Sequence, residues 1–136
     1  MAFDATVFVY LFESTGQLAA AAIAMANAVS ARRLTGVVSS VALAEVIVRP
    51  IRIGDDTMGE RYADAIRSIE NRHVVPVTIE IAVEAGFVRG RTSLTLADAI
   101  HLAMARQAGA SAFVTNDRRL RSMPELAVIQ LADLVA

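Results

Sequence analysis

Cysteine is absent from this chain of 136 residues. A protein without thiols forms no disulfides, binds no zinc through thiolates and has no cysteine nucleophile. Lysine is absent as well, so all 13 basic residues are arginines. Chemistry that needs an ammonium group, such as phosphate binding by a P-loop lysine or Schiff-base formation, is therefore excluded. The missing lysine is equally consistent with the bias of a GC-rich genome.

Long hydrophobic runs are also missing. The longest strictly apolar stretch, Leu18 to Ala26, has nine residues, whereas a helix needs about 20 to cross a membrane. The chain begins Met1-Ala2-Phe3-Asp4, with an acid where a signal peptide would carry lysine or arginine. We therefore expect a cytoplasmic protein without a membrane segment.

The abundant residues are small and aliphatic. Hydrophobic residues make up 55% of the chain and aromatic residues only 5%. This composition argues against disorder and predicts one domain over residues 1–136, with helices packed closely on a sheet. The net charge is −1, from 14 acids and 13 bases, so bulk electrostatics do not demand a nucleic-acid partner.

Short apolar segments alternate with helical patterns along the chain. Strands are predicted at the start of the apolar run 3–11 and over residues 37–39, 73–77, 110–115 and 128–131. Helices are predicted over about 15–32, from a cap at 39 or 40 to before Pro50, over 57–72, from Thr78 to 89 and from Thr95 to 107, with a turn and short helix at 116–121. All-apolar strands that alternate with helices favour a parallel sheet covered on both faces.

Two acids fall at the ends of predicted strands. Asp4 closes the first strand, and Asp117 follows the strand that contains Ala112 to Thr115. Functional sites of open parallel sheets form at the carboxyl ends of the strands. Both carboxylates are therefore candidates for such a site, although Asp4 alone would also suit an ordinary turn.

Two further acids lie on helix faces that are otherwise apolar. Glu45 shares its face with Val48, and Asp98 lies in the apolar segment 94–103. A buried carboxylate is costly unless it is compensated, and neither face offers an obvious local arginine. A helix cap or an arginine pair across the core would explain one such acid alone, and Asp98 does follow Thr95 in the first helical turn.

Four such acids together point to a shared site. If Asp4, Glu45, Asp98 and Asp117 converge, their repulsion must raise some of their pKa values or be offset by a cation. Oxygen ligands, no cysteine and only two histidines fit Mg²⁺ or Mn²⁺. These ions suit phosphodiester cleavage, because they activate water and neutralise charge on the phosphate and on the leaving oxygen.

The sequence around these acids resembles the four motifs of the PIN-domain family, and of its VapC-like toxin ribonucleases in particular. The similar segments are residues 4–10, 39–46, 96–103 and 113–120. They cover nearly the whole chain in the order and spacing of the family, and the third and fourth segments carry most of the specificity. Ala5 departs from the pattern, because the family usually has threonine there, so one hydroxyl beside the pocket is lost.

This resemblance implies a fold, an activity and partners. The fold would be a Rossmann-like three-layer α/β/α sandwich with a parallel central sheet. The activity would be metal-dependent endoribonuclease cleavage of structured RNA, such as tRNA, rRNA or mRNA, by the toxin of a toxin–antitoxin pair. The resemblance also implies a homodimer and inhibition by a cognate antitoxin protein.

The resemblance further assigns roles within a four-acid pocket for Mg²⁺ or Mn²⁺. Asp4 and Asp98 would be the principal ligands, while Glu45 and Asp117 would bind a second ion or orient the water. Hydrogen bonds from three polar residues would shape the pocket: Thr6, Thr115 and Asn116.

Three other residues have two interpretations each. His101 follows Asp98 by three positions and shares its helical face, but a packed or interface histidine is expected rather than a metal or acid–base role. Arg118 and Arg119 follow Asp117 and would either contact RNA phosphates or lie in a solvated turn.

Two rival functions remain open. One is a PIN-domain scaffold or binding module that has lost cleavage, although retention of all four acids argues against it. The other is a nuclease acting on DNA, since a carboxylate pocket cannot itself distinguish ribose from deoxyribose. A phosphatase or a receiver domain is excluded, because both depend on a lysine that this chain lacks.

Overall fold

The structure is a computed structural model that describes residues 1–13, 16–32, 35–68, 72–121 and 126–135. Its centre is a five-stranded, all-parallel sheet with the strand order β3-β2-β1-β4-β5. The strands are β1 (Ala2–Phe3), β2 (Gly36–Ser39), β3 (Arg72–Val75), β4 (Ala112–Thr115) and β5 (Ala127–Gln130). The predicted parallel α/β fold is confirmed.

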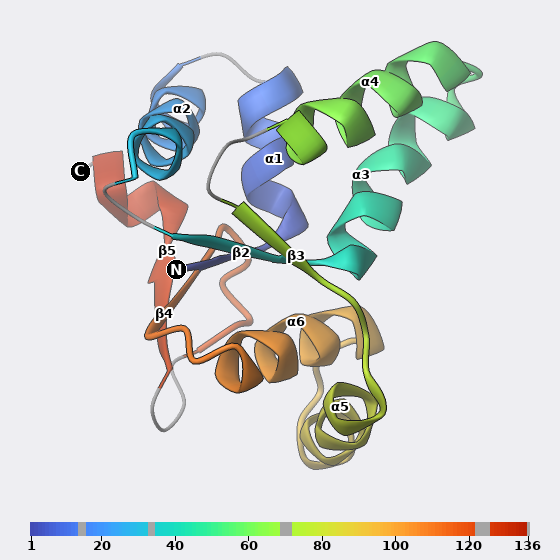
Figure 1. Cartoon of the computed structure of the whole chain (residues 1–136), viewed down its shortest axis with the longest axis vertical. Coiled ribbons are helices and arrows are strands. Elements are labelled where there is room, and N and C mark those ends of the chain that lie inside the picture. Colours follow the sequence, from blue (N-terminus) through green and yellow to red (C-terminus); the bar gives the residue numbers. More distant parts are fainter. Residues whose placement is uncertain (14–15, 33–34, 69–71, 122–125, 136) are drawn as a thin grey trace.

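Helices cover both faces of this sheet (Figure 1). They are α1 (Ala5–Glu13), α2 (Gln17–Ser30), α3 (Ser40–Arg52), α4 (Asp56–Ser68), α5 (Ile79–Arg91) and α6 (Leu96–Gln107), followed by the 3₁₀ helix η1 (Leu131–Val135). Helices α5 and α6 lie on one side of the sheet and α1 to α4 on the other. The chain therefore forms the three layers expected from its alternating pattern.

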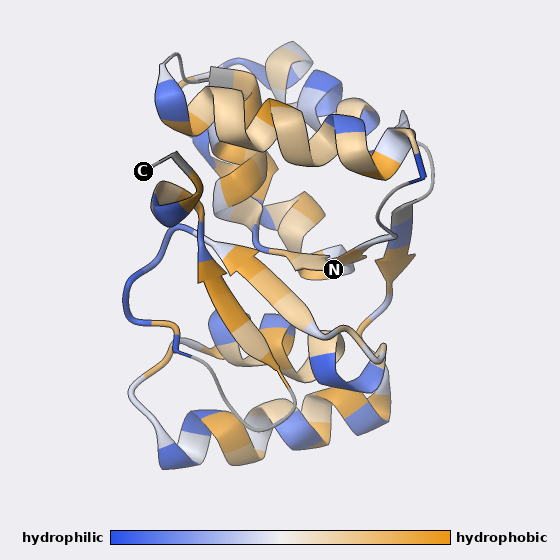
Figure 2. Cartoon of the chain, turned by 90° about the vertical axis from the view of Figure 1, so that its left-hand side faces the viewer, coloured by the Kyte–Doolittle hydropathy of each residue, from blue (hydrophilic) through white to orange (hydrophobic). Residues whose placement is uncertain are grey.

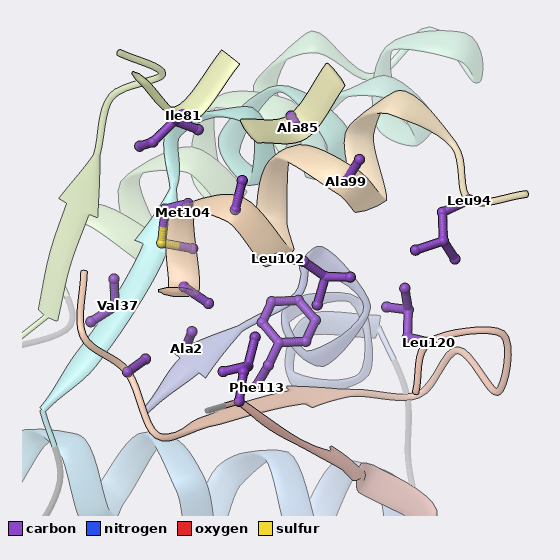
Figure 3. Packing of buried hydrophobic residues seen from close by; sticks show 14 residues of the cluster. Ala2, Val37, Ile81, Ala85, Leu94, Ala99, Leu102, Met104, Phe113 and Leu120 are labelled. Atoms are coloured by element: carbon purple, nitrogen blue, oxygen red, sulfur yellow. The ribbon is translucent and has the colours of Figure 1, made fainter. Parts of the chain in front are cut away.

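Successive residues of β1, β2 and β4 belong to two different hydrophobic clusters. Ala2, Val37 and Phe113 pack with α5 and α6 (Figure 3). The next residues along the same strands pack with helices α1 to α4: Phe3, Val38 and Val114. Side chains alternate between faces along a strand, so a sheet buried on both sides needs strands that are apolar throughout, as the hydropathy colouring shows (Figure 2).

Hydroxyl caps fix the starts of three helices. The side chains of Ser39, Thr78 and Thr95 accept hydrogen bonds from Val41 N, Ile81 N and Asp98 N at 3.2 Å. Each bond satisfies a backbone donor of the first turn that has no partner within the helix. The three predicted caps are confirmed. Thr15, where the helix predicted over about 15–32 would begin, lies outside the described residues.

The prediction that the second helix stops before Pro50 is wrong. Pro50 lies inside α3, which continues to Arg52. Because it stands near the carboxyl end, the ring removes one hydrogen bond from a helix that is already ending. Gly54, with a φ of +82°, lies just beyond the last turn, in a conformation that favours glycine.

Four other features differ from the predictions. No helix was predicted for residues 5–13, where α1 follows a two-residue strand. The helix predicted to reach residue 72 ends at Ser68, and β3 begins at Arg72. His73 is exposed rather than buried, because β3 is an edge strand. Residues 116–121 form a turn without the short helix.

No single helix in the described part of the chain is long and apolar enough to cross a membrane. The segments Ala5–Phe12 and Gln17–Ser30 meet the criteria of length and composition only as a pair bent by 110°, and core helices of globular proteins meet the same criteria. Both helices contribute buried residues to the cluster on their side of the sheet.

Candidate metal centre

The candidate site lies where the strand order changes direction. From β1 the chain proceeds to β2 and β3 on one side, and β4 and β5 lie on the other side. Asp4 directly follows β1, while Asn116 and Asp117 directly follow β4. Ligands of open α/β sheets bind outside the carboxyl ends of the strands at such a switch point, so the fold brings these distant segments together at the expected place.

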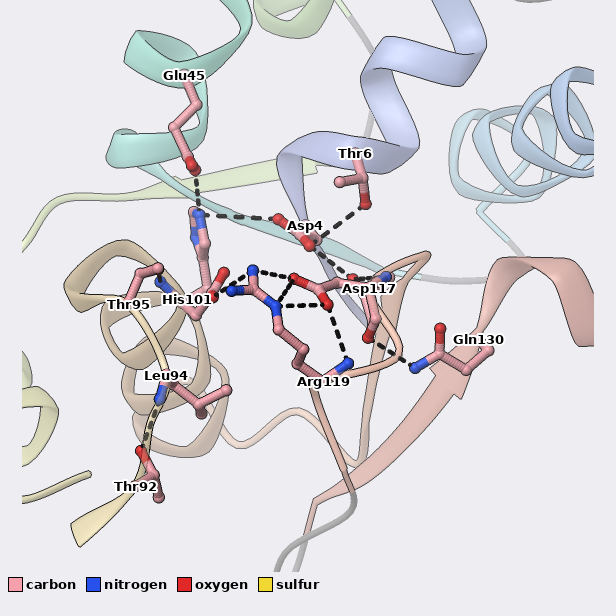
Figure 4. Close-up of polar contacts among 12 residues, drawn as sticks. Asp4, Thr6, Glu45, Thr92, Leu94, Thr95, His101, Asp117, Arg119 and Gln130 are labelled. Atoms are coloured by element: carbon pink, nitrogen blue, oxygen red, sulfur yellow. Dashed lines mark hydrogen bonds and ion pairs between the residues drawn. The ribbon is translucent and has the colours of Figure 1, made fainter. Parts of the chain in front are cut away.

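Asp4 is held by hydroxyl groups from two elements (Figure 4). Thr115 Oγ1 donates a hydrogen bond to Asp4 Oδ2 at 2.6 Å, and Thr6 Oγ1 lies 3.3 Å from the same oxygen. Asp4 itself is only 4% exposed. Burial raises the pKa of Asp4, and the negative charges of Glu45 and Asp98 act in the same direction, while Thr115 and His101 oppose the shift.

His101 lies at the centre of the site. It is fully buried on α6, its Nε2 contacts Glu45 Oε1 on α3, and the same nitrogen lies 3.9 Å from Asp4 Oδ1. Burial lowers the pKa of His101, but the hydrogen bond to Glu45 and the charges of Asp4, Glu45 and Asp98 outweigh it, so the pKa is raised. The expectation of a packed or interface histidine missed this contact, which joins residues 56 positions apart in the chain.

Asp4, Glu45 and His101 bring three potential metal-ligand atoms close together. One ligand atom from each residue lies within 4.8 Å of the other two. The two carboxylates are the oxygen donors that Mg²⁺ and Mn²⁺ prefer. Histidine ligands usually donate their second ring N–H to an acceptor, whereas Nδ1 of His101 is buried without a hydrogen-bond partner among the described residues. This geometry favours His101 as a donor to Glu45 rather than as a metal ligand.

Asp98 and Asp117 are joined by Arg119. Arg119 Nε lies 3.0 and 3.1 Å from the two oxygens of Asp117, and Nη2 lies 3.4 Å from Asp98 Oδ2. The hydrogen bonds and charge of Arg119 hold the pKa of Asp117 below its ordinary value. Asp98 is buried in the first turn of α6. Its arginine partner is not on its own helix face but 21 positions further along the chain, which is the pair across the core that the sequence left open.

The four predicted acids thus share one edge of the sheet but divide into two groups. Asp4 and Glu45 gather around His101, whereas Asp98 and Asp117 flank Arg119. The groups are close enough for the charge of Asp98 to raise the pKa of Asp4.

The predicted supporting residues connect the strand ends to α1. Asn116 N donates to Thr6 Oγ1 at 3.2 Å, and Asn116 Nδ2 donates to Tyr10 Oη at 3.1 Å. Asp117 N donates to Thr115 Oγ1 at 3.0 Å. Tyr10 was not predicted to take part, because nothing in its local pattern distinguishes it from other residues of the apolar run.

The two arginines behave differently. Arg119 faces the carboxylates, whereas Arg118 pairs with Asp133 of η1, both on exposed surface. Gln130 at the end of β5 donates to Asp117 O at 2.9 Å and was also missed.

Comparison with known proteins gives the family context. The family described as PIN domain matches residues 1–126. Comparison with curated protein sequences finds no match.

Several solved structures have the same fold as this chain. The VapBC2 complex of Rickettsia felis, solved with a DNA fragment from its promoter, is similar with a TM-score of 0.75 and 15% identity over 95% of this chain and 96% of that one. A toxin–antitoxin complex of Klebsiella pneumoniae has a TM-score of 0.66 and 19% identity, covering 93% and 94%. VapC20 of Mycobacterium tuberculosis, a toxin that cleaves the sarcin–ricin loop, has a TM-score of 0.66 and 18% identity, covering 82% and 85%.

Proposed function

This chain belongs to the PIN-domain family, and from that premise we propose that it is a divalent-metal-dependent endoribonuclease. The observation that carries the proposal is the group formed by Asp4, Glu45 and His101 at the switch point of the sheet. A buried carboxylate with a raised pKa beside a second carboxylate is poorly stabilised by the protein alone. A bound Mg²⁺ or Mn²⁺ would offset that charge.

Each residue of the site has a task in this proposal. Asp4 and Asp98 bind the ion, with Asp4 positioned by Thr115 and Thr6. Glu45, which His101 holds in place, binds the ion or orients the attacking water. When bound, such an ion makes water more acidic and offsets negative charge on a phosphodiester.

Structured RNA is the proposed substrate, and toxicity controlled by an antitoxin is the proposed role. VapC20 of Mycobacterium tuberculosis cleaves the sarcin–ricin loop and shares this fold. The protein of the same fold from Klebsiella pneumoniae was solved in a toxin–antitoxin complex. By this likeness we also propose a cytoplasmic homodimer that a small antitoxin protein inhibits.

Cleavage by purified protein tests the activity. The substrates are tRNA, rRNA and single-stranded DNA, each with Mg²⁺, with Mn²⁺ and with a chelator. We expect metal-dependent cleavage of RNA, and Asp4→Asn or Glu45→Gln should lower the rate at least about a hundredfold, the upper end of what loss of a metal's outer-shell partner costs. Asp64→Asn is the matched control, because Asp64 is exposed on α4 and pairs with Arg67.

The rival functions give different results. Faster cleavage of DNA than of RNA would indicate a DNA nuclease. Metal binding without cleavage of any substrate would indicate a scaffold. Full activity of Asp4→Asn would contradict the assigned site, and unimpaired growth of cells that express the wild-type chain alone would contradict the toxin role.

A further inference from the structure

Arg119 occupies one side of the carboxylate site. Its Nε and backbone N both donate to Asp117, at 3.0 and 2.9 Å, and its Nη2 reaches across to Asp98. The contact with Asp98 uses Oδ2, so the proposed cation on the Asp4 side would have to use Oδ1 of the same carboxylate. One guanidinium thus takes the position that a second divalent ion would need between Asp98 and Asp117.

We propose that Arg119 replaces the second metal ion, so that the site binds a single divalent cation on its Asp4 side. This inference rests on the proposed function, because it concerns the metal content of the same site. It also gives Arg119 a different task from the predicted contact with RNA phosphate.

The chemistry of the guanidinium suits this task. Arginine stays protonated at every accessible pH, and its planar fork can bind a carboxylate through two nitrogens while it reaches a second one. Unlike a divalent metal ion, it supplies positive charge without needing bound water molecules or a fixed number of ligands. Because no lysine occurs in the chain, arginine is the residue available for a permanent side-chain cation at this position.

The solvent exposure of Arg119 limits how strongly it can compete with a second divalent ion. The side chain is 62% exposed, whereas that of Asp98 is 10% exposed. Water and salt weaken an exposed ion pair, so a second divalent ion can displace the guanidinium once its concentration is high. The first position has no guanidinium to displace and should fill at lower concentrations. We therefore expect one tightly bound ion under ordinary conditions.

Counting bound Mn²⁺ tests the proposal without an activity assay. Equilibrium dialysis of purified protein against Mn²⁺ should give one ion per chain for the wild type. Arg119→Gln should bind a second ion over the same concentration range, because Asp98 and Asp117 are then free. Arg118→Gln is the matched control, since Arg118 is in the same turn but pairs with Asp133, and it should bind one ion like the wild type.

A second variant keeps the test decisive if Arg119→Gln does not fold. Asp117 lies on the Arg119 side, so Asp117→Asn should leave Mn²⁺ affinity at the first position nearly unchanged. A loss of about tenfold or more, typical of residues that support a metal, would overturn the proposal, as would equal ion counts in the wild type and Arg119→Gln. If no variant and no wild-type protein bound Mn²⁺, the proposed metal-dependent function would itself be wrong.

Discussion

At the scale of single residues, the site concentrates negative charge where little water reaches it. Asp4 is 4% exposed and Asp98 is 7% exposed. Burial raises the pKa of Asp4, and the charge of Asp98 acts in the same direction. Three groups of the protein partly stabilise these two carboxylates: the hydroxyl of Thr115 and the ring of His101 beside Asp4, and the guanidinium of Arg119 beside Asp98. None of the three supplies the charge of a divalent ion beside Asp4.

Asp4→Asn should raise the stability of the metal-free protein at neutral pH. The folded-state pKa of Asp4 is raised above its ordinary value of 3.8, so the folded state binds this proton more tightly than the unfolded chain. The resulting stability is fully present below pH 3.8 and is lost as the pH rises through the folded pKa. Removing the charge should therefore raise the melting temperature at pH 7 and change it little near pH 3.

Thermal unfolding in a chelator at both pH values measures this difference. Asp64→Asn, which removes an exposed acid on α4, is the control and should show little change at either pH. A lower melting temperature for Asp4→Asn at pH 7 would contradict the burial argument. Added Mg²⁺ should reverse the ranking, because the ion stabilises the wild type and finds fewer ligands in the variant.

Thr115→Val should weaken the site by releasing Asp4. Thr115 is fully buried, and its hydroxyl both donates to Asp4 and accepts from Asp117 N. Valine keeps the shape but leaves both groups without this partner, which should cost about 1–3 kcal/mol of stability and about tenfold or more in metal affinity. Chemical denaturation and Mn²⁺ titration measure the two effects.

Thr115→Ser is the informative comparison for that variant. Serine keeps the hydroxyl and loses only the methyl group, so metal affinity should stay near the wild-type value. Equal losses of affinity in the serine and valine variants would show that packing around Thr115, and not its hydrogen bond, positions Asp4.

Residue patterns revealed the four acids but not how they are paired. An acid on an apolar helix face is visible in the sequence, as for Asp98, because its environment contradicts its polarity. Its partner Arg119 is 21 positions further along the chain, and only the packing of the turn after β4 against α6 brings the two together. The contact of His101 with Glu45 spans 56 positions and was unpredictable for the same reason.

At the scale of elements, the sequence predicted where helices start more accurately than where they end. Ser39, Thr78 and Thr95 were correctly predicted as caps, because a side-chain oxygen beside free backbone donors is a local interaction. The end of α3 was predicted wrongly from Pro50, since tertiary packing keeps this buried proline within the last turns of the helix. The edge position of β3 depends on strand order, which no single segment encodes.

A pair of glycine variants tests the argument about the end of α3. Gly54 has a φ of +82°, so Gly54→Ala should cost about 1 kcal/mol, although no atom lies within 4 Å of the added Cβ. Gly86 lies within α5 with the same open space and without a positive φ, so Gly86→Ala should stabilise the protein by about 0.5–1 kcal/mol. Urea unfolding measures both values, and changes of the same sign would contradict the conformational explanation.

At the scale of the whole molecule, the topology both assembles the site and joins the two cores. Asp4 and Thr115 are 111 positions apart but in direct contact, because β1 and β4 are neighbours in the sheet. The same strands send alternate side chains into the two clusters. Because the two clusters share the same strands, a loss of packing in one cluster should also destabilise the other.

This coupling predicts that damage to one face lowers the stability of both. Phe113 is fully buried in the cluster of α5 and α6, and Phe113→Leu should cost about 1–2 kcal/mol. Both tyrosines, Tyr10 and Tyr62, pack against the opposite cluster, and the chain has no tryptophan. Tyrosine fluorescence thus reports unfolding of the face that the mutation does not touch, while far-ultraviolet circular dichroism reports all helices. Because the strands belong to both clusters, the fluorescence and circular dichroism signals of Phe113→Leu should shift to the same lower urea midpoint. A fluorescence midpoint that stayed at the wild-type value would show that the two faces unfold independently.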